Sequence, residues 1–285
     1  MKTSCTLTSQ LREGIDAAAM THEVYTHGHH ESVLRSHTWR TAENSAGYLL
    51  AVLRPGLDLL DVGCGPGTIT VDLARLVAPG RVIGIDRASE VLAQASAHAS
   101  GQGVSIDLRV GDVYALQFPD ASFDVVHAHQ LLQHLSDPVR ALAEMRRVLR
   151  RGGVLAARDG DYACFGWAPF DPLLTRWLEL YRAVARRNGG EPDAGRFLKH
   201  WALDAGFSDV QASSSTWTCA DPHSCAWWGN LWADRCELSS FGEQAIAYGL
   251  STREELGAMA TAFRAWSKKR DAFFMVPHGE ILARA

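Results

Sequence analysis

The stretch of sequence that decides the fold is LLDVGCGPGTITVDLARL, residues 59–76. It places three glycines and a proline between a short apolar run and a segment with the apolar spacing of a helix. Glycine adopts backbone dihedral angles that other residues resist, and it lets a ligand approach the backbone closely. A helix that follows such a loop directs its free N–H groups and the positive end of its dipole toward the same place. The stretch therefore predicts a ligand-binding turn between a buried strand and a helix.

Strand and helix patterns alternate through the first half of the chain. Strands that are apolar on both faces and are separated by helices indicate a parallel sheet covered by helices on both sides. The sequence therefore predicts an α/β fold. The expected strands are residues 57–62, 81–86, 104–110, 123–128 and 154–158, and the expected helices are residues 38–53, 68–77, 89–100 and 137–150.

The alternation ends after Asp159, and aromatic residues become frequent, with four tryptophans within residues 217–232. Ser251 and Glu254 have the spacing of a capping box, which predicts the start of a helix. We expect further helices over 172–187, 194–205 and 256–266, and strands over 210–216 and 272–285. We divide the chain into an N-terminal helical lid segment (1–50), a ligand-binding core (51–160), and a C-terminal part of the core with an inserted helical, aromatic-rich substrate cap (161–285).

The composition argues against several classes of protein. A formal net charge of −4, without any run rich in lysine or arginine, provides no basic field for nucleic acid or an anionic membrane. No apolar run approaches the ~18 residues of a membrane span, and the N-terminus lacks the apolar core of a secretory signal. The six cysteines form no CxxC motif, which favours a reducing compartment. We expect a cytoplasmic protein without a nucleic-acid partner or membrane insertion, either a monomer or a homodimer.

Acidic residues mark the ends of three predicted strands. Asp61 enters the glycine loop, where a carboxylate repels a phosphate but suits a cationic group such as an amino-acid ammonium. Asp86 follows Gly67 at close to the ~20 residues expected of a ribose-binding acid. Asp112 is placed to accept a hydrogen bond from an adenine amine, and Val113 to cover the ring. The loop reads GxGxG rather than GxGxxG, so a nicotinamide-dependent oxidoreductase is the less favoured alternative.

These motifs, taken in order, resemble those of class I S-adenosylmethionine-dependent methyltransferases, most closely the ubiquinone/menaquinone-biosynthesis-like small-molecule branch. The matching motifs are DVGCGPG at 61–67, GID at 84–86, GDV at 111–113 and FDVVHAHQLLQHLSDP at 123–138. The resemblance covers roughly residues 45–160. It implies a Rossmann-like, seven-stranded, mostly parallel sheet with helices on both faces. It also implies that S-adenosyl-L-methionine is the cofactor and S-adenosyl-L-homocysteine the product.

The resemblance also implies which residues contact the cofactor. Outside the part of the chain that the resemblance covers, the N-terminal segment is expected to fold over the cofactor, with Tyr25 hydrogen-bonded to the methionine carboxylate and Arg40 paired with it bidentately. The alternative for this segment is a solvated helix face. The other cofactor-binding residues are the loop residues Asp61, Gly63, Gly65 and Gly67, the ribose-binding Asp86 with its neighbour Arg87, the adenine-binding Asp112 and Val113, and His129 and Gln130 on the open side of the cofactor.

Histidines cluster in the same N-terminal segment and raise the question of a metal. No carboxylate or cysteine completes a familiar set of ligands around them, so we predict no metal site. The five histidines are His22, His27, His29, His30 and His37.

The methyl acceptor is expected between the fourth strand and the cap. His134 falls where an acceptor approaches, and its ordinary titration range suits a general base; the alternative is a helix-end histidine bonded to the backbone. Four aromatic residues are predicted to line an apolar acceptor pocket, although they equally suit the core of the cap. We expect methyl transfer to a small, apolar or aromatic metabolite of secondary metabolism, with an O, C or N acceptor left open, and keep a non-catalytic cofactor-binding relative as an alternative. The four residues are Tyr162, Phe165, Trp167 and Trp228.

Overall fold

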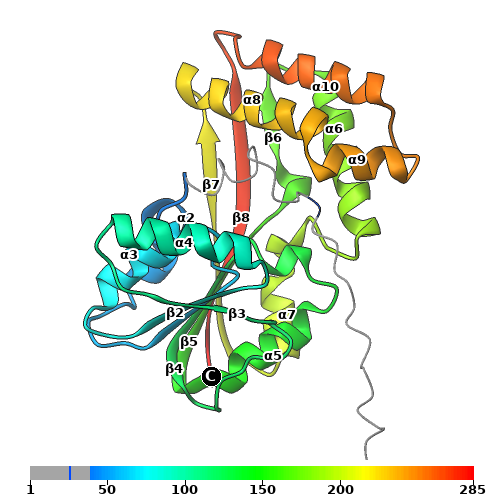
Figure 1. Ribbon diagram of the computed structural model, residues 1–285. Helices are drawn as coiled ribbons and strands as arrows, with labels where there is room; N and C mark the ends of the chain where they lie inside the picture. Colours follow the sequence, from blue (N-terminus) through cyan, green and yellow to red (C-terminus); the bar gives the residue numbers. More distant parts are fainter. Residues whose placement is uncertain (1–25, 27–38) are drawn as a thin grey trace, which may run out of the picture.

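The computed structural model describes Thr26 and residues 39–285. An eight-stranded sheet has the order β3-β2-β1-β4-β5-β8-β6, with β7 also paired to β8. Strands β1 to β5 run parallel, and β8 runs antiparallel to β5, β6 and β7, as Figure 1 shows. The strands are β1 (Leu59–Val62), β2 (Val82–Asp86), β3 (Asp107–Val110), β4 (Phe123–His129), β5 (Leu149–Gly160), β6 (Gly166–Ala168), β7 (Asp209–Cys219) and β8 (Phe273–Arg284).

The predicted α/β class and the mostly parallel sheet are confirmed, but the predicted number of seven strands is one too low. The additional strand is β6, which pairs with β8, a strand of 12 residues. The second half of β8 pairs with β5, and its first three residues extend past the parallel strands and pair with β6. Strand β6 has only three residues, which is too short for a period of two to be recognised in the sequence.

Helices cover both faces of the parallel strands. On one face, apolar side chains of α2 and α3 pack with Leu59 and Val125. On the other face, side chains of α5 and α7 pack with Leu60 and Val126. Because successive strand residues point to opposite faces, β1 and β4 are buried on both sides. The helices are α2 (Ala42–Leu50), α3 (Thr68–Val77), α4 (Ser89–Gly101), α5 (Pro138–Val148), α6 (Pro172–Arg187), α7 (Leu198–Asp204), α8 (Pro222–Leu238), α9 (Ser240–Ala247) and α10 (Arg253–Trp266).

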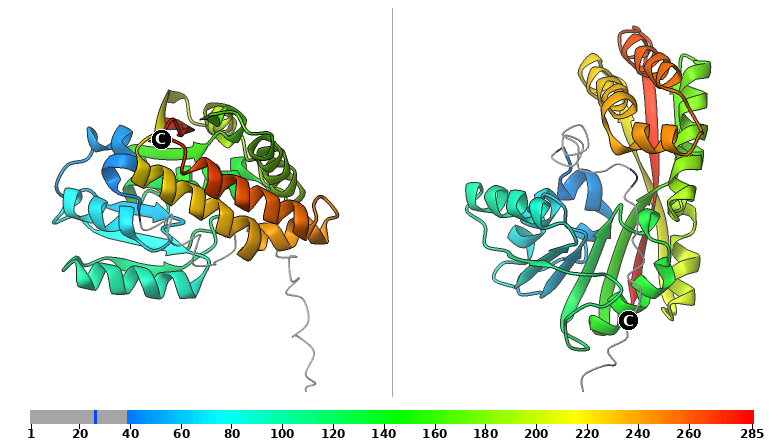
Figure 2. Two further views of the ribbon diagram at one scale, coloured as in Figure 1. Left: turned by 90° about the horizontal axis from the view of Figure 1, so that it is seen from above. Right: turned by 45° about the vertical axis from the view of Figure 1, so that its right-hand side comes forward.

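Helices α6, α8, α9 and α10 form a helical layer beyond the carboxyl ends of the parallel strands, and the long strands β7 and β8 extend into it (Figure 1, Figure 2). This helical layer has its own aromatic core. The ring of Trp177 lies 4.3 Å from that of Trp232 and 5.0 Å from that of Phe263, and all three side chains are buried. Among the helices of Thr26 and residues 39–285, we find none that is long and apolar enough to cross a membrane.

The start of α10 differs from the sequence prediction by one residue. The hydroxyl of Thr252 accepts a hydrogen bond from the Glu255 N–H at 3.2 Å and caps the helix. Ser251 instead donates its hydroxyl proton to the carboxylate of Glu255, at 2.7 Å. The predicted capping box of Ser251 and Glu254 is therefore wrong. Two adjacent hydroxyl residues are followed by two adjacent glutamates, so the spacing alone does not distinguish the two pairs.

Candidate active site

The glycine loop joins β1 to α3 at the carboxyl end of the sheet. Gly63, Gly65 and Gly67 have positive φ angles of 72°, 55° and 76°, a region that residues with a Cβ rarely adopt. A Cβ on Gly63 would lie 3.0 Å from the side chain of Leu131, and one on Gly67 would lie 2.9 Å from that of Ala95. The loop therefore needs glycine for both its conformation and its packing. Gly63 and Gly65 also line a pocket at this edge of the sheet.

Asp86 ends β2 and is fixed beside the glycine loop. One carboxylate oxygen accepts a hydrogen bond from the N–H of Gly65 and the other from the N–H of Ala88, both at 3.0 Å. Ala88 is the N-cap of α4, so Asp86 also bonds to the backbone at the start of this helix. Arg87 next to it is exposed. The half-buried carboxylate of Asp86 lies at the strand end where the sequence places a ribose.

A hollow beside β3 contains one of the two residues predicted to bind adenine, Asp112. Ile85, Asp112 and Phe118 are among its lining residues. The carboxylate of Asp112 accepts a hydrogen bond from the N–H of Tyr114 at 2.9 Å, which stabilises the turn after β3. Val113 is buried in the core below the hollow. The placement is compatible with adenine binding, which stays a prediction.

Asp61 is buried at the end of β1 and has two partners inside the protein. One carboxylate oxygen lies 2.7 Å from Nδ1 of His127 on β4, and the other accepts a hydrogen bond from the hydroxyl of Thr70 on α3 at 2.5 Å. Asp61 also lines the pocket with the glycine loop. Asp61 therefore connects β1 to β4 and to α3. Its predicted contact with an ammonium group would be made in addition to these two bonds.

Arg40 and Gln130 form a chain of hydrogen bonds that ends at His278. Arg40 Nη2 donates to the side-chain oxygen of Gln130 at 2.5 Å, and the Gln130 amide nitrogen lies 2.8 Å from Nε2 of His278. The amide donates this second bond, so His278 carries its own proton on Nδ1. Burial lowers the pKa of His278 well below its usual range and keeps the ring neutral. Gln130 has a positive φ of 50°, and Arg40 lines the pocket of the glycine loop.

His129 ends β4 and lies in the wall of the same pocket. The residue is only 6% exposed, and neither ring nitrogen has a hydrogen-bond partner among the described residues. Burial lowers its pKa well below the usual range, and the nearby charges of Arg40 and Arg158 lower it further. His129 is therefore a neutral imidazole whose two nitrogens have no partner in the described part of the protein.

A group of charged and aromatic residues on β5, β7 and β8 lies next to His129 and was not predicted from the sequence. Arg158 and Glu280 are buried and joined by a bond of 3.1 Å from Arg158 Nε to a glutamate oxygen. The guanidinium of Arg158 lies 4.8 Å from the ring centre of Trp217. The predicted strand over 272–285 contained a usable signal, because His278 and Glu280 are two residues apart and therefore share one face.

His134, the predicted general base, lies in the 3₁₀ helix η1 (Leu132–His134). Its Nε2 is 3.1 Å from the side-chain nitrogen of Gln133. Burial lowers the pKa of His134 to about 3, with smaller effects from the charges of Arg40 and Arg235. A neutral imidazole with so low a pKa is a weak base near pH 7, so the geometry gives little support to the predicted role.

The four predicted acceptor-pocket residues lie in or against the aromatic core of the helical layer. The ring of Tyr162 stacks on Phe165 at 4.3 Å and on Tyr181 at 4.2 Å. Trp228 lies 5.3 Å from Phe274, and the partly buried Trp167 lies 5.7 Å from it. These contacts are those of a packed core, which was the alternative that the sequence left open.

Several other predictions fall outside this site. Tyr25 and the five N-terminal histidines lie outside the described residues. Within Thr26 and residues 39–285, no group of three His, Cys, Asp or Glu side chains is placed to hold a metal ion.

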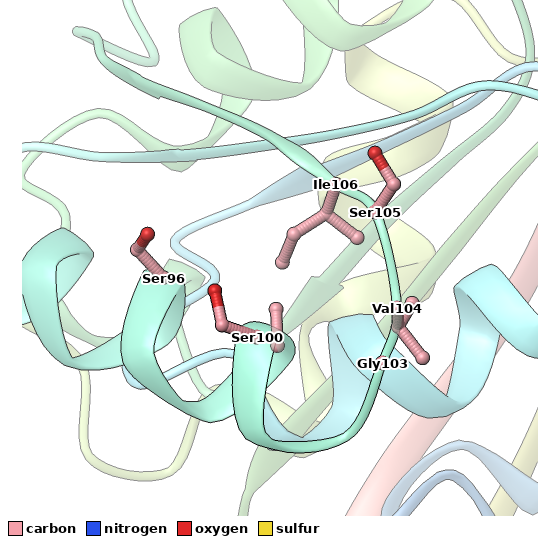
Figure 3. A pocket seen from close by; sticks show the side chains of 7 residues that line it. Ser96, Ser100, Gly103, Val104, Ser105 and Ile106 are labelled. Atoms are coloured by element: carbon pink, nitrogen blue, oxygen red, sulfur yellow. The ribbon is translucent and has the colours of Figure 1, made fainter.

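Figure 3 shows a different hollow, which Ser96, Ser100 and Ser105 help to line between the end of α4 and the segment before β3. Because this segment leads into β3, that hollow lies at the amino edge of the sheet, opposite the glycine loop.

Comparison with known proteins identifies the class of this chain. Residues 60–157 match the family model described as "Methyltransferase domain". An uncharacterized methyltransferase, C1B3.06c, of Schizosaccharomyces pombe is 34% identical over 90% of this chain and 95% of its own length. A demethylmenaquinone methyltransferase of Renibacterium salmoninarum is 32% identical over 55% of this chain and 68% of its own length. The YcgJ protein of Bacillus subtilis has the same fold, with a TM-score of 0.52 at 19% identity over 84% of this chain and 96% of that chain.

The chain therefore belongs to the S-adenosylmethionine-dependent methyltransferases, as the motifs indicated. It is a methyltransferase, and S-adenosylmethionine is its cofactor. The residues of the site suit this cofactor, because the glycine loop leaves no room for side chains at Gly63 and Gly67 and the carboxylate of Asp86 lies at the end of the neighbouring strand.

Proposed function

We propose that the protein transfers a methyl group from S-adenosylmethionine to a small molecule in the pocket between the glycine loop and His129. The observation that carries this proposal is the bond between the Asp86 carboxylate and the Gly65 N–H. It holds an acid suited to ribose hydroxyls directly beside a loop suited to an amino-acid chain. The pocket lining, which includes Arg40, Asp61 and His129, supports the same position for the reacting end.

The residues of the chain would divide the work of binding in the following way. Gly63 and Gly65 would contact the methionine part, with Arg40 at its carboxylate and Asp61 at its ammonium, while Asp86 would hold the ribose. The bound cofactor supplies a methyl group that is already electrophilic. The protein then has to align the acceptor in line with it and exclude water, which can supply several kcal/mol of the barrier reduction.

Binding of S-adenosylhomocysteine, measured by isothermal titration calorimetry, tests this proposal. Asp86→Ala should weaken binding at least about tenfold, because the ribose hydroxyls lose a charged acceptor. Asp271→Ala is the matched control, since Asp271 is exposed in the turn before β8 and should leave affinity unchanged. Unchanged affinity in Asp86→Ala, or no binding to the wild-type protein, would refute the proposal.

The finer identity of the reaction also remains a proposal. We propose an apolar or aromatic metabolite as the acceptor, because the ring of Trp217 lies 5.9 Å from that of His129, which lines the pocket. A relative named for demethylmenaquinone is consistent with a small-molecule acceptor. We further propose that the enzyme acts in the cytoplasm, in secondary metabolism, as a monomer or homodimer without a nucleic-acid partner. The division into a lid (1–50), a cofactor-binding core (51–160) and a C-terminal part with a cap (161–285) belongs to the same proposal.

A further inference from the structure

We propose that the methyl acceptor binds against His129 and Trp217 and presents an oxygen atom to the cofactor, as a phenol, an enol or a similar acidic hydroxyl group. This inference rests on the proposed methyl transfer and names the acceptor class for the same pocket. It places the acceptor at the sheet, below the aromatic core of the helical layer. The observations that carry it are the unpartnered nitrogens of His129, the setting of Trp217, and an excess of hydrogen-bond donors around them.

His129 is the polar group of the pocket that most clearly lacks a partner. It lies in the pocket wall together with Gly63 and Asp61, is 6% exposed, and has no bond to either nitrogen within the described part of the chain. A buried polar group without a partner destabilises the protein. A ligand atom that reaches His129 removes this cost. The end of β4 is also directly next to the loop that would hold the methionine part of the cofactor.

Trp217 provides a rigid flat surface beside His129. Its ring centre lies 5.9 Å from that of His129 and 4.4 Å from that of His278. Its indole N–H donates to the backbone carbonyl of Asn44 at 2.7 Å, which fixes the ring orientation. Trp39 packs edge-on against it at 5.1 Å. An aromatic side chain held in this way favours a planar molecule that can pack against its ring.

Hydrogen-bond donors exceed acceptors around these two rings. Arg158 lies over Trp217 and is paired with His129 in the register of β4 and β5. One of its terminal nitrogens, Nη1, and the hydroxyl of Tyr48 are buried without a partner among the described residues. Both oxygens of Glu280 are already occupied, by Arg158 and by two serine hydroxyls of β7. The surroundings therefore suit an oxyanion, which accepts several hydrogen bonds, better than an amine, which has one lone pair and becomes a cation when it is methylated.

Transfer to an oxygen needs no protein base in this setting. The acceptor hydroxyl first releases its proton to solvent, and the Nη1 group of Arg158, which has no partner among the described residues, favours the resulting oxyanion. The oxygen then forms a bond to the methyl carbon while the carbon–sulfur bond breaks, and the electron pair of that bond stays on sulfur. An anion and a sulfonium cation thus give two neutral groups. His129 donates a hydrogen bond to the oxyanion, and the low pKa of His134 does not limit the reaction.

The test combines binding and turnover. S-adenosylhomocysteine affinity is measured first by calorimetry for the wild type, His129→Phe, His129→Gln and the control His200→Phe, which removes an exposed histidine of α7. Enzyme saturated with S-adenosylhomocysteine is then mixed with 4-nitrophenol, whose absorption reports its ionisation. Finally, each protein is incubated with S-adenosylmethionine and a panel of phenols and the anilines of matched ring substitution, and methylated products are identified by mass.

We expect the wild type to methylate phenols and to increase the ionisation of bound 4-nitrophenol. His129→Phe should lose that increase and lower kcat/KM for phenols about 10- to 100-fold, whereas His129→Gln should restore part of both. His200→Phe should match the wild type in S-adenosylhomocysteine affinity and in turnover. Methylation of anilines alone, no methylation of any phenol, or equal activity of His129→Phe would overturn the inference. Failure of the wild type to bind S-adenosylhomocysteine would refute the proposed function itself.

Discussion

The strand ends around the glycine loop and the long strands β5 and β8 hold their polar side chains in different ways. Near the glycine loop, carboxylates accept hydrogen bonds from the backbone: Asp86 bonds to Gly65, 21 positions away, and Asp112 bonds to Tyr114, two positions away. On β5 and β8, buried polar side chains bond to one another, and Arg158 and Glu280 are 122 positions apart. Asp86 and Asp112 therefore fall within motifs that can be recognised in the sequence, whereas the pairing of Arg158 with Glu280 depends on the order of the strands in the sheet.

The two kinds of polar contact are also expected to affect different properties of the protein. A carboxylate at a strand end next to a glycine loop keeps part of its surface in solvent and can exchange protein contacts for a ligand. A buried ion pair has lost its hydration, so removal of one partner leaves an uncompensated charge. We therefore expect substitutions in the C-terminal strands to act mainly on stability, and substitutions at the glycine loop to act mainly on cofactor affinity.

The largest effect is expected for Glu280→Ala. It leaves the buried guanidinium of Arg158 without its carboxylate and should lower the free energy of unfolding by about 3–5 kcal/mol. Urea unfolding followed by circular dichroism measures the change. Glu179→Ala on the exposed side of α6 is the control and should change stability by less than about 0.5 kcal/mol. A loss in Glu280→Ala no larger than that of the control would show that the two regions do not differ in this way.

Trp228→Ala tests whether the helical layer has a core or a pocket at this position. Trp228 is buried and packs against Phe274, so truncation should cost about 3 kcal/mol without changing S-adenosylhomocysteine affinity. Trp227→Ala, at a neighbouring and only partly buried tryptophan, should cost clearly less in the same urea experiment. If Trp228→Ala leaves stability unchanged but raises KM for an accepted phenol, Trp228 lines the acceptor pocket as the sequence predicted.

The sequence predicted the α/β class, the helices on both faces and the turn at the glycine loop. These features depend on apolar periodicity and on glycines close together in the chain, and both are readable within about 20 residues. It did not predict the surroundings of Trp217, because they arise from the pairing of β7 with β8 and of β8 with β5. Nor did it distinguish a pocket wall from a core for Tyr162 and Phe165, because aromatic composition is the same for both.

Asp159 on β5 is expected to make the stability of the protein depend on pH. Burial raises the pKa of Asp159 to about 7, and one oxygen accepts a hydrogen bond from the Gln133 N–H at 3.1 Å. Because the unfolded chain has a pKa near 3.9, the native state binds more protons between about pH 4 and 7. Its contribution to stability is complete below about pH 4 and is lost as the pH rises to about 7.

Asp159→Asn removes this titration. The free energy of unfolding of the wild type should fall by about 2 kcal/mol more than that of the variant between about pH 5 and 8. Urea midpoints at several pH values measure the difference, and Asp271→Asn, at an exposed aspartate, should follow the wild type. Parallel pH profiles for Asp159→Asn and the wild type would mean that Asp159 is ionised in the native state, as we expect for the carboxylates of Asp86 and Asp112 near the glycine loop.

The smallest effect concerns the start of α10, where the C-terminal region does contain a local polar contact. Thr252→Ala removes the hydroxyl that accepts from the Glu255 N–H and should cost about 1 kcal/mol. Ser251→Ala removes only a bond to the Glu255 side chain and should cost a few tenths of a kcal/mol at most. The two variants are compared by their urea midpoints. The expected order would show that even a contact between near neighbours is decided by backbone conformation and not by residue spacing. The reverse order would restore the capping box that the sequence placed at Ser251.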